Sequence, residues 1–401
     1  MSGLAWLEAL GPQRIRPGLG RTRALLDSFG SPDRAVRSVL VGGTNGKGST
    51  AAALSAILTA AGVRTGLYTS PHLVRVTERI RIDDADVPEG LLDDALALVA
   101  AVAGPGERGP TYFEALTVAA LELFRRARVE VALLEVGIGG RLDATNAVEP
   151  EISIVTNVGR DHLEILGPTL ADVAREKAGI FRRRQPALVG AEGTAADLKA
   201  VLHAEAARLG ARLVEVPPSA LWGGTFPLPG AHQWQNAALA VAASRALAPL
   251  NDAAIAAGLS KTRWRGRLER LTRPGRRPLL LDGAHNPDGA EALGRWLDAE
   301  GLSGRIDLLF GALSDKDLAG TAGPLFARAR RIVLTAPPSP RAAPPEALKT
   351  KLGAAGVETA PSALAALERL DADAPGDAPV LVAGSLYLVG EVLRLLERES
   401  G

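Results

Sequence analysis

Short, mostly apolar runs alternate with longer segments of helical spacing along the first two thirds of the chain. Val131–Val136 and Ile152–Thr156 carry apolar side chains at nearly every position, as expected for strands buried on both faces of a parallel sheet. The segments between such runs are rich in alanine and leucine and are long enough for helices. Strands that alternate with helices predict a doubly wound α/β core.

The same pattern predicts the individual elements of this core. The further expected strands are Ser38–Val41, Arg64–Tyr68, Ile80–Ile82, Ala187–Val189 and Ala211–Val216. The expected helices are Leu4–Leu10, Arg21–Phe29, Thr50–Ala61, Leu91–Val102, Thr111–Arg126, Leu170–Gly179 and His232–Leu247.

The pattern changes at residues 272–278, which are charged, contain proline and carry few apolar side chains. Such a composition is typical of a boundary between domains. We therefore predict an N-terminal domain of residues 1–271, a linker of residues 272–278 and a C-terminal domain of residues 279–401. The last of these has its own strand–helix units and is predicted to be a smaller open α/β sheet, with strands at Leu279–Asp282, Asp307–Phe310, Arg331–Thr335 and Val380–Ala383.

A glycine-rich stretch, Val41–Thr50, joins the first predicted strand of the core to its first helix. Glycines there allow successive backbone N–H groups to face one anion, and the helix adds its positive N-terminal dipole. Lys47 is placed to reach the β- and γ-phosphates of a nucleotide. The usual pattern has Ser or Thr directly after the lysine as a magnesium ligand, but here Gly48 follows. Either Ser49 takes that role or the hydroxyl comes from elsewhere.

Polar residues follow two of the predicted strands at their carboxyl ends, where open α/β sheets bind ligands. Glu135 interrupts an apolar strand, so it either meets an arginine or serves as a magnesium ligand that faces the phosphates. His162 lies beside Asp161 after the next strand. It is either a satisfied polar residue or a group that touches a metal, and its place favours the second interpretation.

Five other positions stand out less clearly from the residues alone. Lys177 lies in a predicted helix and by itself suggests only a surface lysine. Asn236 shares a helix face with residues three positions away and is able to contact an adenine edge. Arg267 precedes the predicted linker and is a candidate for stabilising charge on a γ-phosphate. Asp282 and His285 follow the first strand of the second domain, which suggests that this domain completes a site begun by the first.

The composition excludes several classes of protein. Of the 401 residues 47% are hydrophobic and 23% are charged, as in ordinary globular proteins of two or three domains. A formal net charge of +1 gives no reason to expect nucleic acid or a membrane as a partner. The absence of cysteine excludes disulfides and thiol chemistry. No apolar run reaches the length of a membrane span, so we expect a cytoplasmic protein.

Six stretches together resemble folylpolyglutamate synthase, and they occur in the order of that family. They are Gly43–Thr50, Thr69–Leu73 with Thr77–Ile80, Leu134–Asn146, Asn157–His162, Glu176–Phe181 and Asp282–Pro287. In bacteria this family often combines its activity with that of dihydrofolate synthase, and it belongs with the Mur-type amide ligases. The residues after Pro287 match mainly in their α/β pattern.

The resemblance implies an N-terminal P-loop ATPase domain, a smaller C-terminal Rossmann-like α/β domain and an active site in the cleft between them. It implies ATP as co-substrate and two Mg²⁺ ions. The sequence leaves the oligomeric state open, and we expect a monomer. The carboxylate of the acceptor, a reduced folate or dihydropteroate, would attack the γ-phosphate of ATP to give an acyl phosphate. The amino group of L-glutamate would then displace phosphate and form the amide.

The resemblance also implies a role for each matching residue. ATP would contact Thr44, Asn45, Gly46, Lys47, Gly48, Ser49, Asn236, Arg267 and Asp282. The metal ligands would be Ser70, Glu135, His162 and a carbamylated Lys177. The pterin would lie against Thr111, Tyr112, Phe113, Glu114, Leu142, Asp143 and Ala144. The catalytic residues would be Lys47, His162, Lys177 and His285, the last near the reacting carboxylate.

Two departures and three alternatives accompany this interpretation. Arg265 stands where the family usually has proline, and Arg267 is further from Asp282 in sequence than expected. A P-loop ATPase or nucleotide switch with a binding domain is the first alternative, but it leaves Lys177 and His285 without a role. Another Mur-type amino-acid ligase usually has a further N-terminal domain. A Rossmann oxidoreductase would depend on Gly137–Gly140 alone, whose spacing does not fit the dinucleotide pattern.

Overall fold

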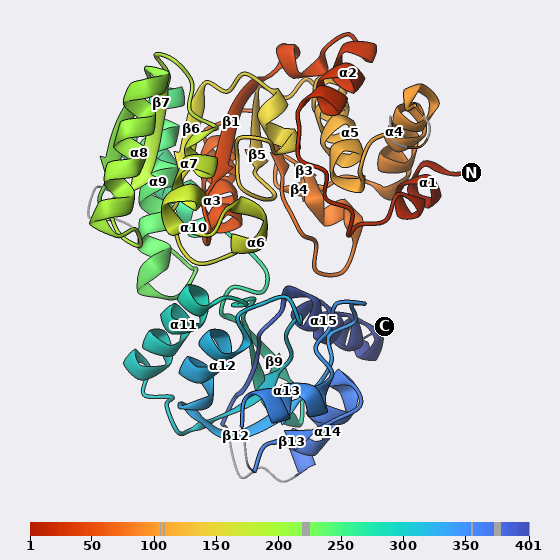
Figure 1. Ribbon diagram of the computed structural model, residues 1–401, viewed down its shortest axis with the longest axis vertical. Helices are drawn as coiled ribbons and strands as arrows, with labels where there is room; N and C mark the ends of the chain where they lie inside the picture. Colours follow the sequence, from red (N-terminus) through yellow and green to blue (C-terminus); the bar gives the residue numbers. More distant parts are fainter. Residues whose placement is uncertain (105, 107–108, 219–224, 354–355, 373–377, 401) are drawn as a thin grey trace. The chain divides into compact units, whose positions relative to one another are not determined.

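The computed structural model describes residues 1–104, 106, 109–218, 225–353, 356–372 and 378–400. The chain divides into two compact units. The first comprises Met1–His72, Val76–Pro227 and Gln233–Arg263, and the second comprises Leu73–Arg75, Leu228–His232 and Trp264–Gly401. Each unit is built on its own sheet (Figure 1).

The first unit contains an eight-stranded sheet in the order β4-β3-β2-β5-β1-β6-β7-β8. Its strands are β1 (Arg37–Gly42), β2 (Thr65–Tyr68), β3 (Ile80–Ile82), β4 (Ala85–Asp86), β5 (Val131–Glu135), β6 (Ile152–Val155), β7 (Pro186–Gly190) and β8 (Arg212–Val216). The neighbouring strands β2, β5, β1, β6, β7 and β8 pair in parallel. Strands β3 and β4 pair antiparallel and form one edge of the sheet. The central strands β1, β5 and β6 are buried almost throughout, which confirms the doubly wound core predicted from their apolar runs.

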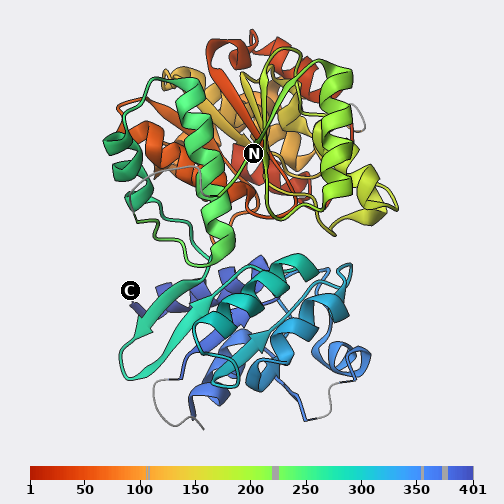
Figure 2. The ribbon, with the colours of Figure 1, turned by 90° about the vertical axis from the view of Figure 1, so that its left-hand side faces the viewer.

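Helices pack on both faces of this sheet (Figure 2). The described α-helices of the unit are α1 (Gly3–Ala9), α2 (Gly20–Ser28), α3 (Lys47–Ala60), α4 (Glu89–Val102), α5 (Tyr112–Arg126), α6 (Leu163–Leu166), α7 (Leu170–Ala178), α8 (Ala196–Leu209), α9 (Ala231–Leu247) and α10 (Asp252–Lys261). Helix α3 begins at Lys47, earlier than the predicted Thr50, because the glycine loop leads directly into its first turn. Helices α8 and α10 were not predicted.

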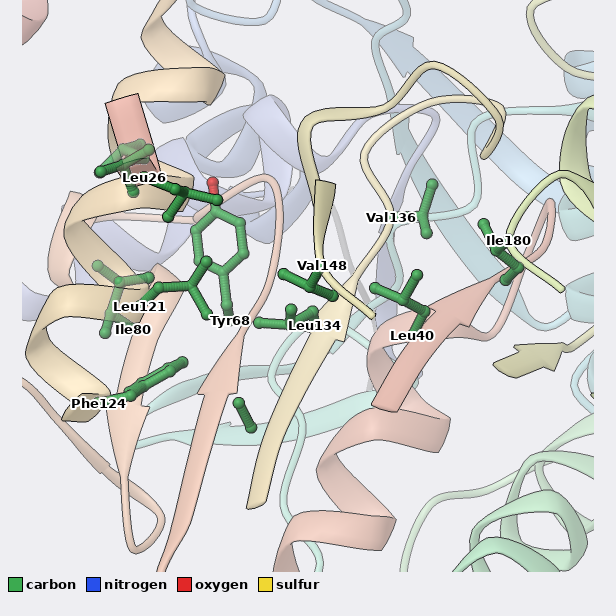
Figure 3. Close-up of a cluster of buried hydrophobic side chains, with 14 of the residues drawn as sticks. Leu26, Leu40, Tyr68, Ile80, Leu121, Phe124, Leu134, Val136, Val148 and Ile180 are labelled. Carbon is green, nitrogen blue, oxygen red and sulfur yellow. The ribbon is translucent and has the colours of Figure 1, made fainter. Parts of the chain in front are cut away.

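The core on one face of the sheet shows why the helices lie close to the strands. Tyr68 from the sheet lies beside Leu121 and Phe124 from α5 (Figure 3). A Cβ on Gly66 would lie 2.6 Å from the Phe124 ring, so only glycine lets α5 approach β2 this closely.

The second unit contains a six-stranded sheet in the order β13-β12-β11-β14-β10-β9. Its strands are β9 (Glu269–Arg273), β10 (Arg276–Leu281), β11 (Ile306–Phe310), β12 (Ala329–Leu334), β13 (Glu358–Thr359) and β14 (Val380–Ala383). Its described α-helices are α11 (Pro287–Ala299), α12 (Leu318–Phe326), α13 (Pro345–Lys351), α14 (Ala363–Ala372) and α15 (Leu386–Ser400). Only β9 pairs antiparallel among the described strands of this sheet, in agreement with the smaller α/β domain that we predicted.

The linker predicted at residues 272–278 is instead part of this sheet, within the long segment Trp264–Gly401 of the second unit. Residues 272–278 include the end of β9, a turn and the start of β10, and the two strands form a hairpin. Gly275 lies in the turn with a φ of +69°. Arg273 and Arg277 are buried, because Arg273 pairs with Asp371 at 2.8 Å and Arg277 pairs with Asp307 at 2.7 Å. The charge that suggested an exposed linker is therefore neutralised by carboxylates distant in sequence.

Among the described residues no helix is long and apolar enough to cross a membrane.

Candidate active site

The glycine loop at the end of β1 has the backbone conformation of a phosphate cradle. Gly43 and Gly46 have φ angles of +137° and +80°, in the region that favours glycine. A Cβ on Gly43 would lie 1.8 Å from Thr156 Oγ1, and one on Gly46 would lie 2.3 Å from Asn236 Oδ1. Helix α3 follows at once, without a side-chain cap at its N-terminus. The loop thus leaves backbone N–H groups of the first helical turn free for an anion.

A neighbouring segment after β6 holds this loop in place. Asn157 Oδ1 accepts hydrogen bonds from the backbone N–H groups of Thr44 and Asn45, at 3.2 and 2.9 Å. The Thr156 hydroxyl donates to the carbonyl of Asn45 at 2.6 Å. The Thr44 hydroxyl accepts from the backbone N–H of Gly159 at 2.9 Å. The loop conformation is therefore set by the structure before any ligand binds.

Two hydroxyls in the first turn of α3 have no protein partner. The Ser49 and Thr50 hydroxyls are buried and find no hydrogen-bond partner among the described residues. Unsatisfied buried hydroxyls are uncommon and call for a ligand or a solvent molecule. They lie next to Gly48, which occupies the place of the usual hydroxyl residue, so the first turn of α3 still offers oxygen atoms to a nucleotide complex.

Two lysines point to the same carbonyl of the loop. Lys47 Nζ donates to the carbonyls of Gly43 and Thr44, each at 3.2 Å, and Lys177 Nζ donates to the carbonyl of Gly43 at 2.8 Å. Lys177 is only 4% exposed. Burial, and secondly the charge of Lys47, lower the pKa of Lys177 to about 7, against a smaller opposite effect of Asp161. The prediction of a surface lysine from the residues alone was wrong.

Polar groups at the carboxyl ends of adjacent strands meet as expected. Glu135 ends β5, and its Oε2 accepts a hydrogen bond from the backbone N–H of Ser70 at 3.1 Å, just beyond the paired strand β2. His162 has a φ of +54° and caps α6. Its ring nitrogens lie 3.7 Å from Asp161 and 3.6 Å from Glu164. No three His, Asp or Glu side chains in the described ranges form a metal cage by themselves, so a metal here would need other ligands as well.

Asn236 of α9 lies against the glycine loop. Its Oδ1 is the atom nearest to the Cβ position of Gly46, and its Nδ2 donates to Gln233 Oε1 at 2.9 Å. Both side chains are buried. The predicted sharing of a helix face by these two residues is thus confirmed, and the amide of Asn236 is oriented by its neighbour.

The stretches predicted to hold the pterin lie together in the first unit. Thr111 and Glu114 form a capping box at the start of α5. The Phe113 ring lies 2.9 Å from the Cβ position of Gly137, which is also 3.2 Å from Asp143 Oδ2. Phe113 packs on Tyr68 with ring centroids 5.6 Å apart. Residues 111–114 and 142–144 therefore meet around Gly137.

Asp143 is held by its own loop. Its carboxylate accepts hydrogen bonds from the backbone N–H groups of Gly137, Ile138 and Thr145 and from the Thr145 hydroxyl. Burial raises the pKa of Asp143 in spite of these four donors. The side chain therefore shapes residues 137–145, the loop that contains Leu142 and Ala144.

In the second unit the β9–β10 hairpin brings together residues that are distant in sequence. Asp282 accepts hydrogen bonds from the backbone N–H groups of Leu268 and Ala284, each at 2.9 Å. Arg267 Nη1 lies 2.3 Å from the Cβ position of Gly283, the residue after Asp282. A ring nitrogen of His285 lies 2.8 Å from the carbonyl of Gly283. The fold thus brings Arg267, Asp282 and His285 into one cluster, although Arg267 is further from Asp282 in sequence than we expected for the family.

Family models and relatives agree with this arrangement. The Mur ligase middle domain matches residues 41–205, and the Mur ligase glutamate ligase domain matches residues 266–386. The dihydrofolate synthase/folylpolyglutamate synthase of Escherichia coli K12 is 37% identical, with 100% of this chain and 96% of that protein covered. The chain belongs to the folylpolyglutamate synthase/dihydrofolate synthase family. A probable bifunctional folylpolyglutamate synthase/dihydropteroate synthase of Haloferax volcanii is 38% identical over 94% of this chain, which spans only 48% of that longer protein.

Solved structures of the family share the fold. Escherichia coli FolC in complex with DHPP and ADP has a TM-score of 0.90 and 33% identity, covering 100% of this chain and 99% of that one. A bifunctional folylpolyglutamate synthase/dihydrofolate synthase with Mn, AMPPNP and L-glutamate bound has a TM-score of 0.86 and 33% identity, covering 99% and 98%. Members of this family thus bind adenine nucleotides, and a divalent metal accompanies the nucleotide in the second structure.

Sequence reasoning missed several side chains that shape the site of this family member. Thr156 and Asn157 clamp the phosphate loop, and their position directly after a strand was the available signal. Arg79 is buried, donates to His72 Nδ1 at 2.9 Å and lies 5.4 Å from the centre of the Tyr112 ring. The sequence around Arg79 gave no indication that its guanidinium would lie beside Tyr112, a residue predicted to contact the pterin.

Proposed function

We propose that this family member adds L-glutamate to the γ-carboxylate of reduced folates, and also to dihydropteroate, in ATP-dependent, ADP-forming reactions. The observation that carries the proposal is the pair of lysines at the phosphate loop, where Lys47 and Lys177 share the carbonyl of Gly43. A simple nucleotide switch has no need for a second, buried amine there. The family relationship supports the choice of glutamate and of folate-like acceptors.

Residues of the first unit would bind and orient ATP. The backbone N–H groups of residues 46–49 and the ammonium of Lys47 would hold the phosphates, as helix N-termini and P-loop lysines do. Asn236, fixed by Gln233, would contact the adenine. From the second unit, Arg267 and Asp282 would contact the nucleotide. Their hydrogen bonds to nearby backbone groups limit the movements of both side chains.

Ser70, Glu135 and His162 would hold Mg²⁺, and we propose two such ions. The orphaned hydroxyl of Ser49 and the oxygen-rich donor set of Ser70 and Glu135 fit a hard cation bound together with phosphate oxygens. When bound, the ions would neutralise the phosphates and make the γ-phosphoryl group a better electrophile.

Lys177 would work as a carbamate and not as an ammonium. Burial lowers the pKa of its amine to about 7, so a substantial fraction of the amine is unprotonated near pH 7. The unprotonated nitrogen can attack carbon dioxide, form an N–C bond and lose one proton. The product is an anionic group with two oxygen atoms in place of a cation. Next to Lys47, this exchange replaces the repulsion between two cations by an attraction.

The acceptor would bind at Thr111–Glu114 and Leu142–Ala144, with its carboxylate directed to the γ-phosphate. Attack by a carboxylate oxygen would break the bond between the γ-phosphorus and the bridging oxygen, which leaves with ADP. The glutamate amine would then attack the acyl carbon and release phosphate, and His285 would lie near this centre. We further propose that the enzyme works as a cytoplasmic monomer on small molecules alone.

An isotope experiment tests this scheme. The acceptor, labelled with ¹⁸O in its carboxylate, is incubated with the protein, ATP, Mg²⁺ and L-glutamate. We expect one ¹⁸O atom in each phosphate released, because the labelled oxygen that bridges carbon and phosphorus in the acyl phosphate leaves with the phosphate. Tetrahydrofolate and dihydropteroate are supplied in separate reactions, and ADP and the amide product are measured. ADP release that needs neither acceptor nor glutamate would favour the nucleotide switch instead.

A further inference from the structure

Arg21 connects three backbone segments around the proposed acceptor site. It lies in the first turn of α2, and its side chain is 23% exposed. Its Nε donates to both carboxylate oxygens of Glu114, at 3.0 and 3.1 Å, and its Nη2 lies 2.8 Å from Glu114 Oε1. The same Nη2 donates to the backbone carbonyl of Arg16. One guanidinium therefore joins the start of α5 to the chain segment that precedes α2.

That preceding segment, residues 11–19, also reaches the second stretch of the proposed acceptor site. The backbone N–H of Gly18 donates to the carbonyl of Leu142 at 3.1 Å. Two sets of hydrogen bonds, joined by the short backbone stretch from Gly18 to Arg16, thus connect Leu142 with Arg21 and Glu114. The second set ends where Glu114 Oε2 accepts from the backbone N–H of Thr111 at 2.7 Å.

Side-chain packing contributes little to the position of residues 11–19. Most of these residues are exposed, including Ile15 at 49%. A cavity of about 400 Å³ lies beside the segment, lined by Arg16, Gly20, Arg21, Ala24, Leu25, Ser28, Val102 and Gly104. With open space on that side, polar contacts position the segment, namely those of Arg21 and Gly18 and a longer contact from Arg16 Nη1 to the carbonyl of Gly109 at 3.5 Å.

Glu114 depends on Arg21 for its charge. Its side chain is 4% exposed, and a carboxylate buried to this degree needs a cation or several donors. Besides Arg21, the backbone N–H of Thr111 donates to its carboxylate. Without Arg21 the buried carboxylate would lose its countercharge and would have to turn toward water, so the first turn of α5 would lose its present geometry.

We propose that Arg21 is a positioning residue for the acceptor. It holds residues 11–19 against both acceptor stretches and so sets the affinity for the pteridine-bearing substrate but not for ATP. This inference rests on the function proposed above. Arg21 acts through Glu114 and the carbonyl of Arg16 and takes no part in the transfer of the phosphoryl group.

The test compares steady-state kinetics of the full chain carrying Arg21→Gln, Arg21→Lys or Glu114→Gln, and the double variant Arg21→Gln/Glu114→Gln. We expect Arg21→Gln to raise the acceptor KM about tenfold, with the KM for ATP unchanged and kcat within about threefold, since only binding geometry is lost. Arg21→Lys keeps the charge but lacks the fork that reaches two acceptors at once, so it should rescue only part of the loss. The double variant should be no worse than Arg21→Gln alone, because both changes break one connection.

Glu122→Gln is the matched control. Glu122 is an equally buried carboxylate on the same helix, paired with Arg125 and Arg126 at 2.8 and 2.7 Å near the other end of α5. We expect it to lower the melting temperature without a change in acceptor KM. An unchanged acceptor KM in Arg21→Gln, or an equal rise in the KM for ATP, would overturn the proposal.

Calorimetric binding of dihydropteroate in the presence of MgADP separates this inference from the proposed function. If the unmodified protein binds no dihydropteroate, the proposed function fails. If it binds and Arg21→Gln binds equally well, only the role of Arg21 fails. Should Arg21→Gln not fold, Arg21→Lys and Glu114→Gln carry the same expectation, and normal acceptor affinity in both would contradict it.

Discussion

Lys47 and Lys177 donate to the same carbonyl oxygen, that of Gly43. Burial, and secondly the charge of Lys47, lower the pKa of Lys177 to about 7. The loop therefore holds one amine suited to phosphate binding and one that loses its proton near neutral pH. These two chemically identical side chains are suited to different roles because they are buried to different degrees.

Lys177→Met should abolish ligation, with a loss in kcat of at least about 100-fold, because the charge arrangement next to the phosphates is lost. Incubation of the unmodified protein with ¹³C-bicarbonate should give a carbamate signal in the ¹³C NMR spectrum, and this signal should be missing in Lys177→Met. Lys199→Met is the control, since Lys199 pairs with Glu215 at 3.0 Å away from the loop. A carbamate signal that persists in Lys177→Met would contradict the assignment.

Glu135→Gln should keep the fold but raise the Mg²⁺ concentration needed for half-maximal activity by about tenfold or more, because a neutral amide is a weaker ligand for a hard cation. The amide retains an oxygen that can accept from the N–H of Ser70, so the change is confined to charge. Activity measured over a range of Mg²⁺ concentrations checks this. An unaltered Mg²⁺ dependence would remove Glu135 from the metal site.

Gly46→Ala should weaken ADP binding by about tenfold or more. The new Cβ would lie 2.3 Å from Asn236 Oδ1 at a φ of +80°, so both the loop and the amide must shift. Gly62→Ala is the matched control at the other end of α3, with a φ of +82° and no atom within 4 Å of the Cβ position. It should cost only the backbone strain of about 1–2 kcal/mol. Calorimetric titration with MgADP distinguishes the two, and equal effects would mean that the contact with Asn236 is unimportant.

Asp307→Asn should destabilise the second unit by about 3–5 kcal/mol at pH 7, because it leaves the buried Arg277 without its countercharge. Burial alone would raise the pKa of Asp307, but hydrogen bonds from Arg330 and Arg277 outweigh burial and hold its pKa below the ordinary value. The stabilisation is therefore complete above the unfolded pKa of about 4 and is lost as the pH falls through the lower, folded pKa.

Urea unfolding between pH 5 and pH 2.5 checks this pH dependence. The free energy of unfolding should fall more steeply with decreasing pH in the unmodified protein than in Asp307→Asn. Asp252→Asn, which changes a carboxylate that is 78% exposed, should leave both the stability and its pH dependence nearly unaltered. Parallel curves for the unmodified protein and Asp307→Asn would show that Asp307 contributes nothing through its charge.

The sequence by itself determined the layered architecture and indicated the strand ends at which we propose the site. Apolar runs such as Val131–Val136 identify central strands, because a strand covered by helices on both faces has no solvent side. The stretch from Val41 to Thr50 identifies the phosphate loop, because glycines, lysine and a following helix have few other uses in this order. Polar residues at strand ends, Glu135 and His162, were found for the same topological reason.

Only the tertiary structure decided the environment of individual charges. Lys177 seemed a surface residue, yet it continues the face formed by Val173 and Ala174, and that spacing was the signal that it is buried. Residues 272–278 seemed a linker, yet Arg277 meets Asp307 from a distant strand. Spacing along a helix can indicate its buried face, but the partners of a buried charge come from residues far apart in sequence, and no local pattern contains them.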